Sequence, residues 1–234
     1  MFTLNCKGKL LVLDTPIIMG IINATPDSFY KGNLDDDILG IAAKMIEDGA
    51  TILDIGGQST KPKSITLSAK EELARVMPFI KKIAAAFPQT IISIDTFYSE
   101  VAIEAVNAGA SIVNDISAGN MDSKMLSTVA RLNVPYVCMH MQGTPASMQV
   151  NPTYQNVSKE ILEFFISKLE ECKNAGVKDV IIDPGFGFGK TIEHNYSLLK
   201  NLPVFSMLDK PILAGLSRKS MIYKPLKTFF GSCF

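Results

Sequence analysis

The sequence predicts a single α/β domain built around a parallel β-sheet, for three reasons. Short apolar runs rich in β-branched residues recur along the 234-residue chain. These runs are continuously hydrophobic, which is typical of parallel strands buried on both faces. Helix-length amphipathic segments separate them, and a repeated strand–helix pattern predicts βαβ units. The expected strands are residues 17–23, 51–55, 91–95, 111–115, 134–140, 179–183 and 211–217.

The segments between these strands carry the sequence signals of helix ends. Residues 34–48 begin with aspartates, which are favourable at a helix N-terminus, and Gly49 follows as a C-terminal cap. Residues 68–87 begin with the spacing of a capping box, with Ser68 as N-cap and Glu71 three residues later. Further helices are expected at 99–108, 122–132 and 158–175.

Polar residues at the strand ends favour a (β/α)8 TIM barrel over an open doubly wound sheet. A barrel gathers its chemistry from the carboxyl ends of many strands, whereas an open sheet concentrates it at one switch point. The polar residues at or near the ends of the expected strands are Asn23, Asp54, Asp95, Asn114, Asp115, His140, Asp183 and the run Ser217-Arg218-Lys219.

Seven expected strands are one short of a closed barrel, so we expect a TIM barrel that lacks its last βα units. Residues 2–14 are expected to form an N-terminal β-hairpin about Lys7-Gly8 that closes the bottom of the barrel. A single domain is expected over residues 1–234, with residues 227–234 as an atypical tail.

The composition excludes several classes of function. Lys plus Arg equals Asp plus Glu, at 23 each, so no basic surplus indicates a nucleic-acid partner. No apolar stretch is long enough to span a membrane, and the first residues lack the pattern of a signal peptide. The four scattered cysteines predict reduced thiols in a cytoplasmic protein, and neither a disulfide framework nor a zinc site.

Four strand-end residues, Asp95, Asn114, Asp115 and Asp183, are the most informative set. A carboxylate without partners at the end of an apolar strand loses several kcal/mol of hydration. Capping of the next helix is a structural alternative for each residue. Together at one rim they predict a ligand rich in N–H donors, and an aminopyrimidinone ring fits because one carboxylate can accept two adjacent donors.

The first two loops offer groups for a cation and a phosphate. In NATPDSF (23–29), the amide oxygen of Asn23 suits a hard cation such as Mg²⁺. In DIGGQSTKP (54–62), the paired glycines permit close backbone approach, and Ser59, Thr60 and Lys61 suit an anionic phosphate. Ordinary turns or a surface loop are the alternatives for both segments.

Two later motifs complete the expected site. DPGFGFGKT (183–191) is not a P-loop, because three residues instead of four separate Gly185 from Gly189-Lys190, but its phenylalanines can form a wall for a flat ring. GLSRKSM (215–221) places Lys219 where it can polarise a ring oxygen or nitrogen, with a solvated surface as the alternative. His140 either lines the site or packs in the core, and no covalent nucleophile is apparent.

Taken in order, NATPDSF, DIGGQST, SIDT, NDI, MHMQGTP, DPGFGFGKT and GLSRKS resemble the dihydropteroate synthase family over residues 19–225. The resemblance implies a homodimeric (β/α)8 barrel. It also implies condensation of 6-hydroxymethyl-7,8-dihydropterin diphosphate with p-aminobenzoate to 7,8-dihydropteroate and diphosphate, in folate biosynthesis, with sulfonamides as competitors.

The resemblance also assigns roles to residues of this chain. The pterin pocket falls on Asp95, Asn114, Asp183 and Lys219, of which Asp95, Asp183 and Lys219 are the expected catalytic residues. Thr60 is expected near the diphosphate, and Asn23 is expected to hold Mg²⁺. The p-aminobenzoate site is expected to involve Phe29, Ser59, Thr60, Lys61, Pro62, Ser217 and Arg218.

The chain departs from the family pattern in three places. Residues 30–33 read Tyr-Lys-Gly-Asn where the family has Ser-Asp-Gly-Gly, and Lys61 replaces an arginine and its bidentate fork. The family's last strand, with Arg-x-His-Asp, has no counterpart. An inactive, truncated pterin-binding or dimerising fragment is therefore one alternative. A pterin-dependent, corrinoid-linked methyltransferase is another, against which the loops at Phe29 and Pro62 argue.

Overall fold

The computed structural model describes residues 1–24, 34–58, 66–144, 147–148 and 150–225. Its centre is a sheet of parallel strands paired in the order of the sequence, each with its neighbour along the chain. The six strands are β3 (Ile18–Asn23), β4 (Ala50–Gly56), β5 (Ile91–Asp95), β6 (Ile112–Asp115), β7 (Tyr136–Met139) and β8 (Val180–Asp183). The predicted βαβ organisation is confirmed.

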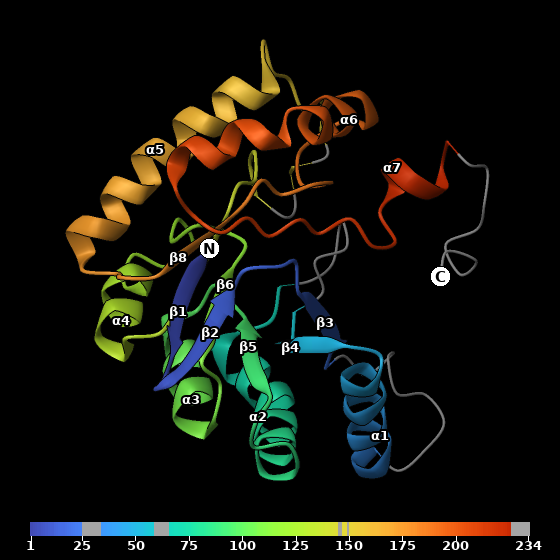
Figure 1. Cartoon of the computed structure of the whole chain (residues 1–234), viewed down its shortest axis with the longest axis vertical. Helices are drawn as coiled ribbons and strands as arrows, with labels where there is room; N and C mark the ends of the chain where they lie inside the picture. Colours follow the sequence, from blue (N-terminus) through green and yellow to red (C-terminus); the bar gives the residue numbers. More distant parts are fainter. Residues whose placement is uncertain (25–33, 59–65, 145–146, 149, 226–234) are drawn as a thin grey trace.

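Helices surround the sheet on its outer side (Figure 1). They are α1 (Leu34–Glu47), α2 (Ala69–Ala86), α3 (Ser99–Ala108), α4 (Met125–Leu132), α5 (Val157–Ala175), α6 (Ile192–Lys200), the 3₁₀ segment η2 (Leu202–Leu208) and α7 (Ser220–Tyr223). Their apolar faces form the main core with the strands; Val76 and Ile80 of α2 and Ile94 of β5 are fully buried there. The predicted capping box of α2 is present, with Ser68 and Glu71 bonded reciprocally.

Helix α4 begins later than the sequence predicts, and the reason is local. Asp122, expected inside this helix, accepts a hydrogen bond from the backbone N–H of Lys124 and another from that of Ser99 at the start of α3. The carboxylate therefore ties a turn to the neighbouring helix, and α4 starts at Met125.

The N-terminal hairpin forms as predicted. Strands β1 (Phe2–Cys6) and β2 (Lys9–Leu13) pair antiparallel about Lys7 and Gly8, whose positive φ angles of 55° and 90° fit a two-residue hairpin turn. Apolar hairpin residues pack against the beginnings of the barrel strands; this second core cluster includes Leu4, Cys6, Leu11, Ile52, Ile91, Ile112, Val137 and Ile181. The hairpin lies across the strands in Figure 1 and covers their amino ends. A site for a ligand is therefore expected at the opposite, carboxyl ends of the strands.

The strand expected at 211–217 is reduced to one parallel bridge between Ile212 and Ile182. The N–H of Leu213 donates to the carbonyl of Ile182, and the N–H of Ile182 donates to that of Pro211. Among the described residues no strand connects this segment to β3, so the curved sheet is open there. The fold is thus of the predicted (β/α) barrel type, with a shorter seventh strand. No described helix combines the length and apolar character needed to cross a membrane.

Candidate active site

The carboxyl ends of neighbouring strands place predicted site residues in one register row. Asn23 of β3 is aligned with Gly56 of β4, Gly56 with Asp95 of β5, and Asp95 with Asn114 of β6. A Cβ atom at Gly56 would lie 3.2 Å from Oδ2 of Asp95, so the glycine leaves the space beside this carboxylate free. On β8, Asp183 ends the strand and is aligned with Met139 of β7.

Asp54 fixes the orientation of the Asn114 amide. The Nδ2 group of Asn114 donates to Oδ2 of Asp54 over 2.9 Å. Asp54 is buried, and it was not among the site residues predicted from the sequence. This bond orients the amide, and the Asn114 oxygen, which no bond within the described residues uses, can act as a hydrogen-bond acceptor. Asp54 therefore affects the site indirectly, by orienting the side chain of Asn114.

Burial raises the pKa of each carboxyl group in this set. The pKa of Asp95 is raised well above its ordinary value, first by burial and then by the negative charges of Asp54, Glu72 and Asp115. Burial also raises the pKa of Asp183, and the positive charge of Lys219 offsets part of that effect. Carboxylates in such surroundings gain from N–H donors on a ligand, since these replace the lost hydration.

Lys219 and an aromatic wall lie beside Asp183. The Lys219 ammonium donates to the carbonyl of Phe186 and lies 4.7 Å from the centre of the Phe188 ring. Burial lowers the pKa of Lys219, and the nearby Asp183 carboxylate opposes this shift. A Cβ at Gly187 would lie 3.2 Å from Cδ of Lys219, so this glycine lets the lysine stem pass.

An apolar cluster extends this wall. Its buried members are Phe97, Ile116 and Met139, and Phe188 packs against them. The predicted use of the glycine-rich motif as a wall for a flat ring is consistent with this packing.

Lys190 is a feature that sequence reasoning missed, although the motif that contains it was identified. Its ammonium is buried and donates to the carbonyls of Gly185 at 2.8 Å and Phe188 at 3.0 Å. It also lies 3.0 Å from Nδ1 of His140. Burial lowers the pKa of Lys190 to about 7. The buried lysine thus stabilises the turn after Asp183 by hydrogen bonds to two of its carbonyl groups.

His140 takes the packing role that was left open. Its ring is buried and lies edge-on to Phe164, with centroids 4.8 Å apart. Burial, with the adjacent Lys190 charge, lowers the pKa of His140 to about 3, so the ring is neutral at ordinary pH.

Asp115 does not belong to the ligand-binding set, and the expectation for it is wrong. The residue is fully buried. Its Oδ1 accepts from the backbone N–H and the hydroxyl of Ser117, both at 2.7 Å, and its Oδ2 accepts from the Gly119 N–H and the Tyr136 hydroxyl, both at 2.8 Å. Both oxygens are therefore used within the protein, which corresponds to the structural alternative of capping the following turn.

The remaining predicted residues fall into two groups. Asn23, Ser217 and Arg218 are exposed at the same end of the barrel, and no ion pair joins Arg218 to an acidic side chain within the described part of the chain. Phe29, Ser59, Thr60, Lys61 and Pro62 lie outside the described residues.

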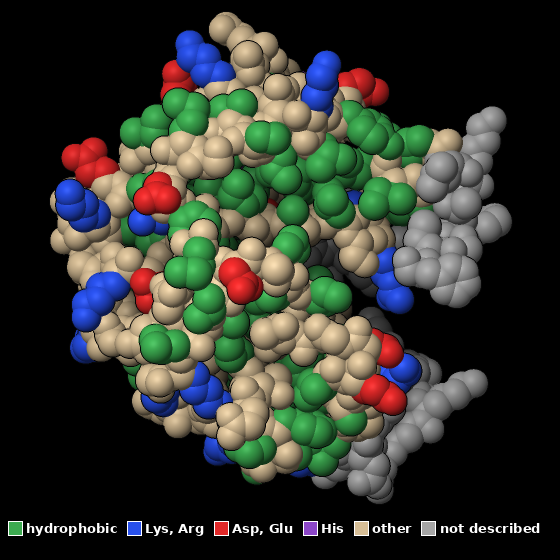
Figure 2. All heavy atoms as spheres, in the orientation of Figure 1, with side chains coloured by type: hydrophobic (Ala, Val, Ile, Leu, Met, Phe, Trp, Pro, Cys, Tyr) green, Lys and Arg blue, Asp and Glu red, His purple; other side chains and the backbone are tan. Residues whose placement is uncertain are grey.

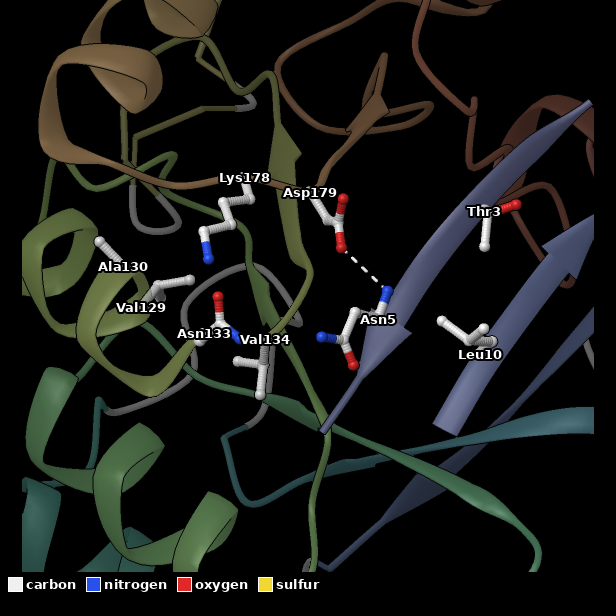
Figure 3. A pocket seen from close by; sticks show the side chains of 9 residues that line it. All are labelled: Thr3, Asn5, Leu10, Val129, Ala130, Asn133, Val134, Lys178 and Asp179. Atoms are coloured by element: carbon white, nitrogen blue, oxygen red, sulfur yellow. Dashed lines mark hydrogen bonds between the residues drawn. The ribbon is translucent and has the colours of Figure 1, made fainter. Parts of the chain in front are cut away.

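A cavity of about 260 Å³ lies at the opposite end of the molecule, beneath the hairpin (Figure 3). Its lining includes Asn5, Asn133, Lys178 and Asp179, and Asp179 accepts a hydrogen bond of 2.9 Å from the backbone N–H of Asn5. This bond anchors the hairpin to the start of β8. The cavity is separate from the row of residues at the carboxyl ends.

Comparison with known proteins agrees with this geometry. Residues 19–231 match the family described as "Pterin binding enzyme". The dihydropteroate synthase of Haemophilus influenzae is 45% identical over 225 residues, which cover 94% of this chain and 81% of the relative. The Escherichia coli K12 enzyme is 43% identical over 221 residues, covering 92% of this chain and 78% of that protein.

Solved structures give the same result. The Yersinia pestis dihydropteroate synthase, solved as a sulfonamide drug complex, has a TM-score of 0.92 and 40% identity, covering 98% of this chain and 85% of its own. The Xanthomonas albilineans enzyme in complex with 7,8-dihydropteroate has a TM-score of 0.85 and 38% identity, covering 96% and 81%. The chain therefore belongs to the pterin-binding enzyme family and, within it, to the dihydropteroate synthases.

Proposed function

We propose that the chain is a transferase that condenses 6-hydroxymethyl-7,8-dihydropterin diphosphate with p-aminobenzoate. The observation that carries this proposal is the rim on which Asp95, the Asn114 amide oxygen and Asp183 act as acceptors beside the Lys219 ammonium. A pterin ring has the complementary pattern, since its amino group and ring N–H groups donate and its carbonyl and remaining nitrogens accept.

In the proposed reaction, the protein binds and orients and does not form a covalent bond. The carbon–oxygen bond between the pterin methylene and diphosphate breaks, and the electron-rich ring delocalises the positive charge left on carbon. The p-aminobenzoate nitrogen then forms a new carbon–nitrogen bond and releases a proton. Asp95, Asp183 and Lys219 are the proposed catalytic residues, because their fixed charges face the ring on which charge develops. The apolar wall of Phe188 and Met139 excludes water from that ring.

A magnesium ion fits the proposed site through Asn23. No cluster of three or more His, Cys, Asp or Glu residues suited to a metal occurs in the described ranges. Mg²⁺, however, commonly takes one or two protein oxygens and completes its shell with substrate phosphates and water. Asn23 supplies one exposed side-chain oxygen in the same register row as Asp95. The ion would neutralise charge on the departing diphosphate, and Thr60 is proposed as a further contact to that group.

The second substrate is proposed to bind between the first two loops and the end of the barrel. Phe29 and residues 59–62 come directly after β3 and β4 along the chain. Ser217 and Arg218 are exposed and directly precede Lys219 in the chain. The related Xanthomonas albilineans enzyme was solved with 4-aminobenzoic acid, which supports this substrate class for the present chain. Sulfonamides are proposed as competitors on the same basis.

We further propose a homodimer, a cytoplasmic location and a single domain over residues 1–234. Support for the dimer is an outer surface with exposed apolar side chains, namely Ile166 of α5, Tyr196 of α6 and Val204 and Met207 of η2. Figure 2 shows hydrophobic side chains at the surface in this part of the molecule. The free, buried thiols of Cys6, Cys138 and Cys172 support a reducing compartment.

The test combines turnover with binding. Dihydropteroate formation is measured from the two substrates with Mg²⁺, and pterin binding is measured by calorimetry for the wild type, Asp183→Asn and the matched control Asp179→Asn. Asp183→Asn is expected to weaken pterin binding at least tenfold, because one acceptor oxygen and the charge are lost. Asp179 lies at the opposite end of β8, so its variant should bind normally. Unchanged binding by Asp183→Asn would show that the pocket is assigned wrongly.

A second candidate is a pterin-binding protein without turnover. The observation in its favour is that, within the described residues, the sheet is open beside β3, where Ile18 and Ile21 are exposed. A folded wild-type chain that binds the pterin with the expected stoichiometry, yet forms no dihydropteroate with Mg²⁺ and p-aminobenzoate, would establish this candidate over the first.

A further inference from the structure

The carbonyl that accepts from Lys219 belongs to a peptide unit that is held from its other side. The Lys219 ammonium donates to the carbonyl of Phe186. The same peptide unit carries the N–H of Gly187, which donates to Oδ1 of Asn195 at 2.7 Å. The described chain contains no cis peptide bond, so the carbonyl and the N–H of this unit point in opposite directions. One rigid plane therefore connects Asn195 on α6 with the ammonium of Lys219.

The Asn195 amide is held in a single orientation. Its Nδ2 donates to the carbonyl of Thr191 at 2.6 Å and to that of Lys190 at 3.4 Å. If the amide were reversed, its oxygen would face two carbonyls, and its NH₂ group would face the Gly187 N–H. Asn195 is buried, and a buried polar group without partners is costly. Its amide oxygen is therefore fixed toward Gly187.

Helix α6 gives this amide a firm support. The helix begins with a reciprocal cap, in which the Thr191 hydroxyl accepts from the His194 N–H at 3.1 Å and Nδ1 of His194 accepts from the Thr191 N–H at 3.2 Å. Further along, the Tyr196 hydroxyl donates to the carbonyl of Met221 in α7 at 2.8 Å. Helix α6 therefore also holds the short helix that follows Lys219.

Other side chains hold other parts of the same glycine-rich turn. Lys190 donates to two carbonyls of the turn, and the Tyr154 hydroxyl donates to the Gly189 carbonyl at 2.9 Å. These bonds stabilise the turn, but they are made to peptide units other than the one that accepts from Lys219. Of these anchors, Asn195 is the one bonded to that unit.

We propose that Asn195 is a positioning residue for Lys219 and acts through the peptide unit between Phe186 and Gly187. The proposal rests on the proposed function, in which the Lys219 ammonium faces the pterin ring. Asn195 does not touch the substrate. It aims the Phe186 carbonyl at the ammonium, and a peptide whose N–H is bonded is also a stronger acceptor at its oxygen. Because the flexible lysine is ordered before the pterin binds, less conformational entropy is lost on binding.

Two small substitutions separate the acceptor of Asn195 from its donors. Asn195→Asp keeps an acceptor for the Gly187 N–H and loses the donor to the Thr191 carbonyl. Asn195→Ser does the reverse, because a serine hydroxyl in a helix can donate to the carbonyl of the preceding turn but is too short to reach Gly187. Affinity for 6-hydroxymethyl-7,8-dihydropterin diphosphate, measured by calorimetry, should fall about tenfold in Asn195→Ser and stay within about twofold in Asn195→Asp. An equal or larger loss in folded Asn195→Asp would overturn the proposal, since Asn195 would then serve only the helix.

A double-mutant cycle tests whether the effect passes through Lys219. Lys219→Met removes the ammonium, so adding Asn195→Ser to it should weaken pterin binding by less than about twofold further. Losses that multiply in the double variant would overturn the proposal.

Tyr154→Phe is the matched control for general loosening of the turn. It removes one hydrogen bond to the turn and leaves the peptide unit before Gly187 untouched. Its affinity for the pterin should stay within about twofold of the wild type. A loss equal to that of Asn195→Ser would assign the effect to the turn as a whole and overturn the specific role of Asn195.

Lysine acetylation without substrate separates this proposal from the proposed function. Labelling of Lys219 by an acetyl succinimidyl ester, followed by mass spectrometry, should be faster in Asn195→Ser than in the wild type, Asn195→Asp and Tyr154→Phe, because the ammonium loses its fixed acceptor. The exposed Lys178 is the internal reference. If Lys219→Met binds the pterin like the wild type, the proposed function fails at this residue. The labelling then still decides whether Asn195 holds Lys219, and equal rates in all four proteins show that it does not.

Discussion

Replacing Asp115 by asparagine is expected to destabilise the fold without a direct effect on substrate binding. In the wild type, each oxygen of this carboxylate accepts one backbone N–H and one hydroxyl, with all four distances at 2.7–2.8 Å. Asparagine keeps one acceptor oxygen and substitutes an NH₂ group for the other. A hydroxyl can rotate to accept from that NH₂ group, but a backbone N–H cannot, so either Ser117 or Gly119 loses its partner.

The magnitude follows from these bonds. A buried N–H without an acceptor costs about 1–3 kcal/mol, and each of the two remaining bonds loses about 1 kcal/mol when its acceptor becomes neutral. Relief of the buried charge, which raises the pKa of Asp115 in the wild type, returns part of this cost. The free energy of unfolding should therefore fall by about 2–4 kcal/mol. For a chain of this size, the melting temperature should fall by roughly 5–15 °C.

The assay is thermal and urea unfolding followed by circular dichroism, with pterin binding measured on the folded fraction. Tyr136→Phe is the graded control, because it removes one hydroxyl and leaves the other three donors in place; about 1 kcal/mol should be lost. The double variant should lose less than the sum of the two. An Asp115→Asn protein with wild-type stability and abolished pterin binding would refute the reasoning and return Asp115 to the binding set.

Two further predictions concern groups that act from beneath the site. Asp54→Leu should weaken pterin affinity about tenfold in calorimetry, because the Asn114 amide loses the acceptor that sets its orientation; unchanged affinity would exclude this indirect role. The pKa of Lys190 is about 7 in the folded protein, and its ordinary value is 10.5. Between these two pH values the unfolded chain binds more protons than the folded chain, so the protein loses stability as the pH falls from about 10.5 to about 7. The free energy of unfolding should thus rise by about 2 kcal/mol from pH 7 to pH 9, and this rise should be missing in Lys190→Met, which is checked by urea unfolding at both values.

The sequence was informative where a signal is local. Apolar runs predicted the positions of the six barrel strands, and the turn at Lys7-Gly8 predicted the hairpin. The strand expected at 211–217 was too long, because Arg218 has a φ of 56° and the Lys219 N–H bonds back to the Leu216 carbonyl. This turn ends the extended segment and carries Lys219 back to Phe186. Hydrophobicity alone does not reveal such a reversal.

Roles that depend on distant partners were not predictable in the same way. Asp115 and Asp183 have the same signal, since each ends an apolar strand, and only the folded chain shows which has internal donors. In the sequence, Glu72 has the pattern of an ordinary acidic residue in the first turn of a helix. In the structure it is buried and accepts a hydrogen bond from Gln58, which lies 14 positions away in the chain. Lys190 gave no sign of its burial, because lysine is most often exposed.

The number of protein donors to each carboxylate provides a physical criterion for separating binding residues from structural ones. Asp115 receives four, whereas Asp183 receives one, from the Gly185 N–H, and Asp95 receives none from the described residues. Burial raises the pKa of all three carboxyl groups; the four donors offset part of this shift for Asp115, whereas the negative charges of Asp54, Glu72 and Asp115 add to it for Asp95. The same Asp→Asn change should therefore have different effects on stability at the two positions. Asp115→Asn should unfold more easily, whereas Asp183→Asn should be as stable as the wild type or more so. Only Asp183→Asn should lose affinity for the pterin. Parallel losses of stability in both variants would show that donor count does not distinguish the two roles.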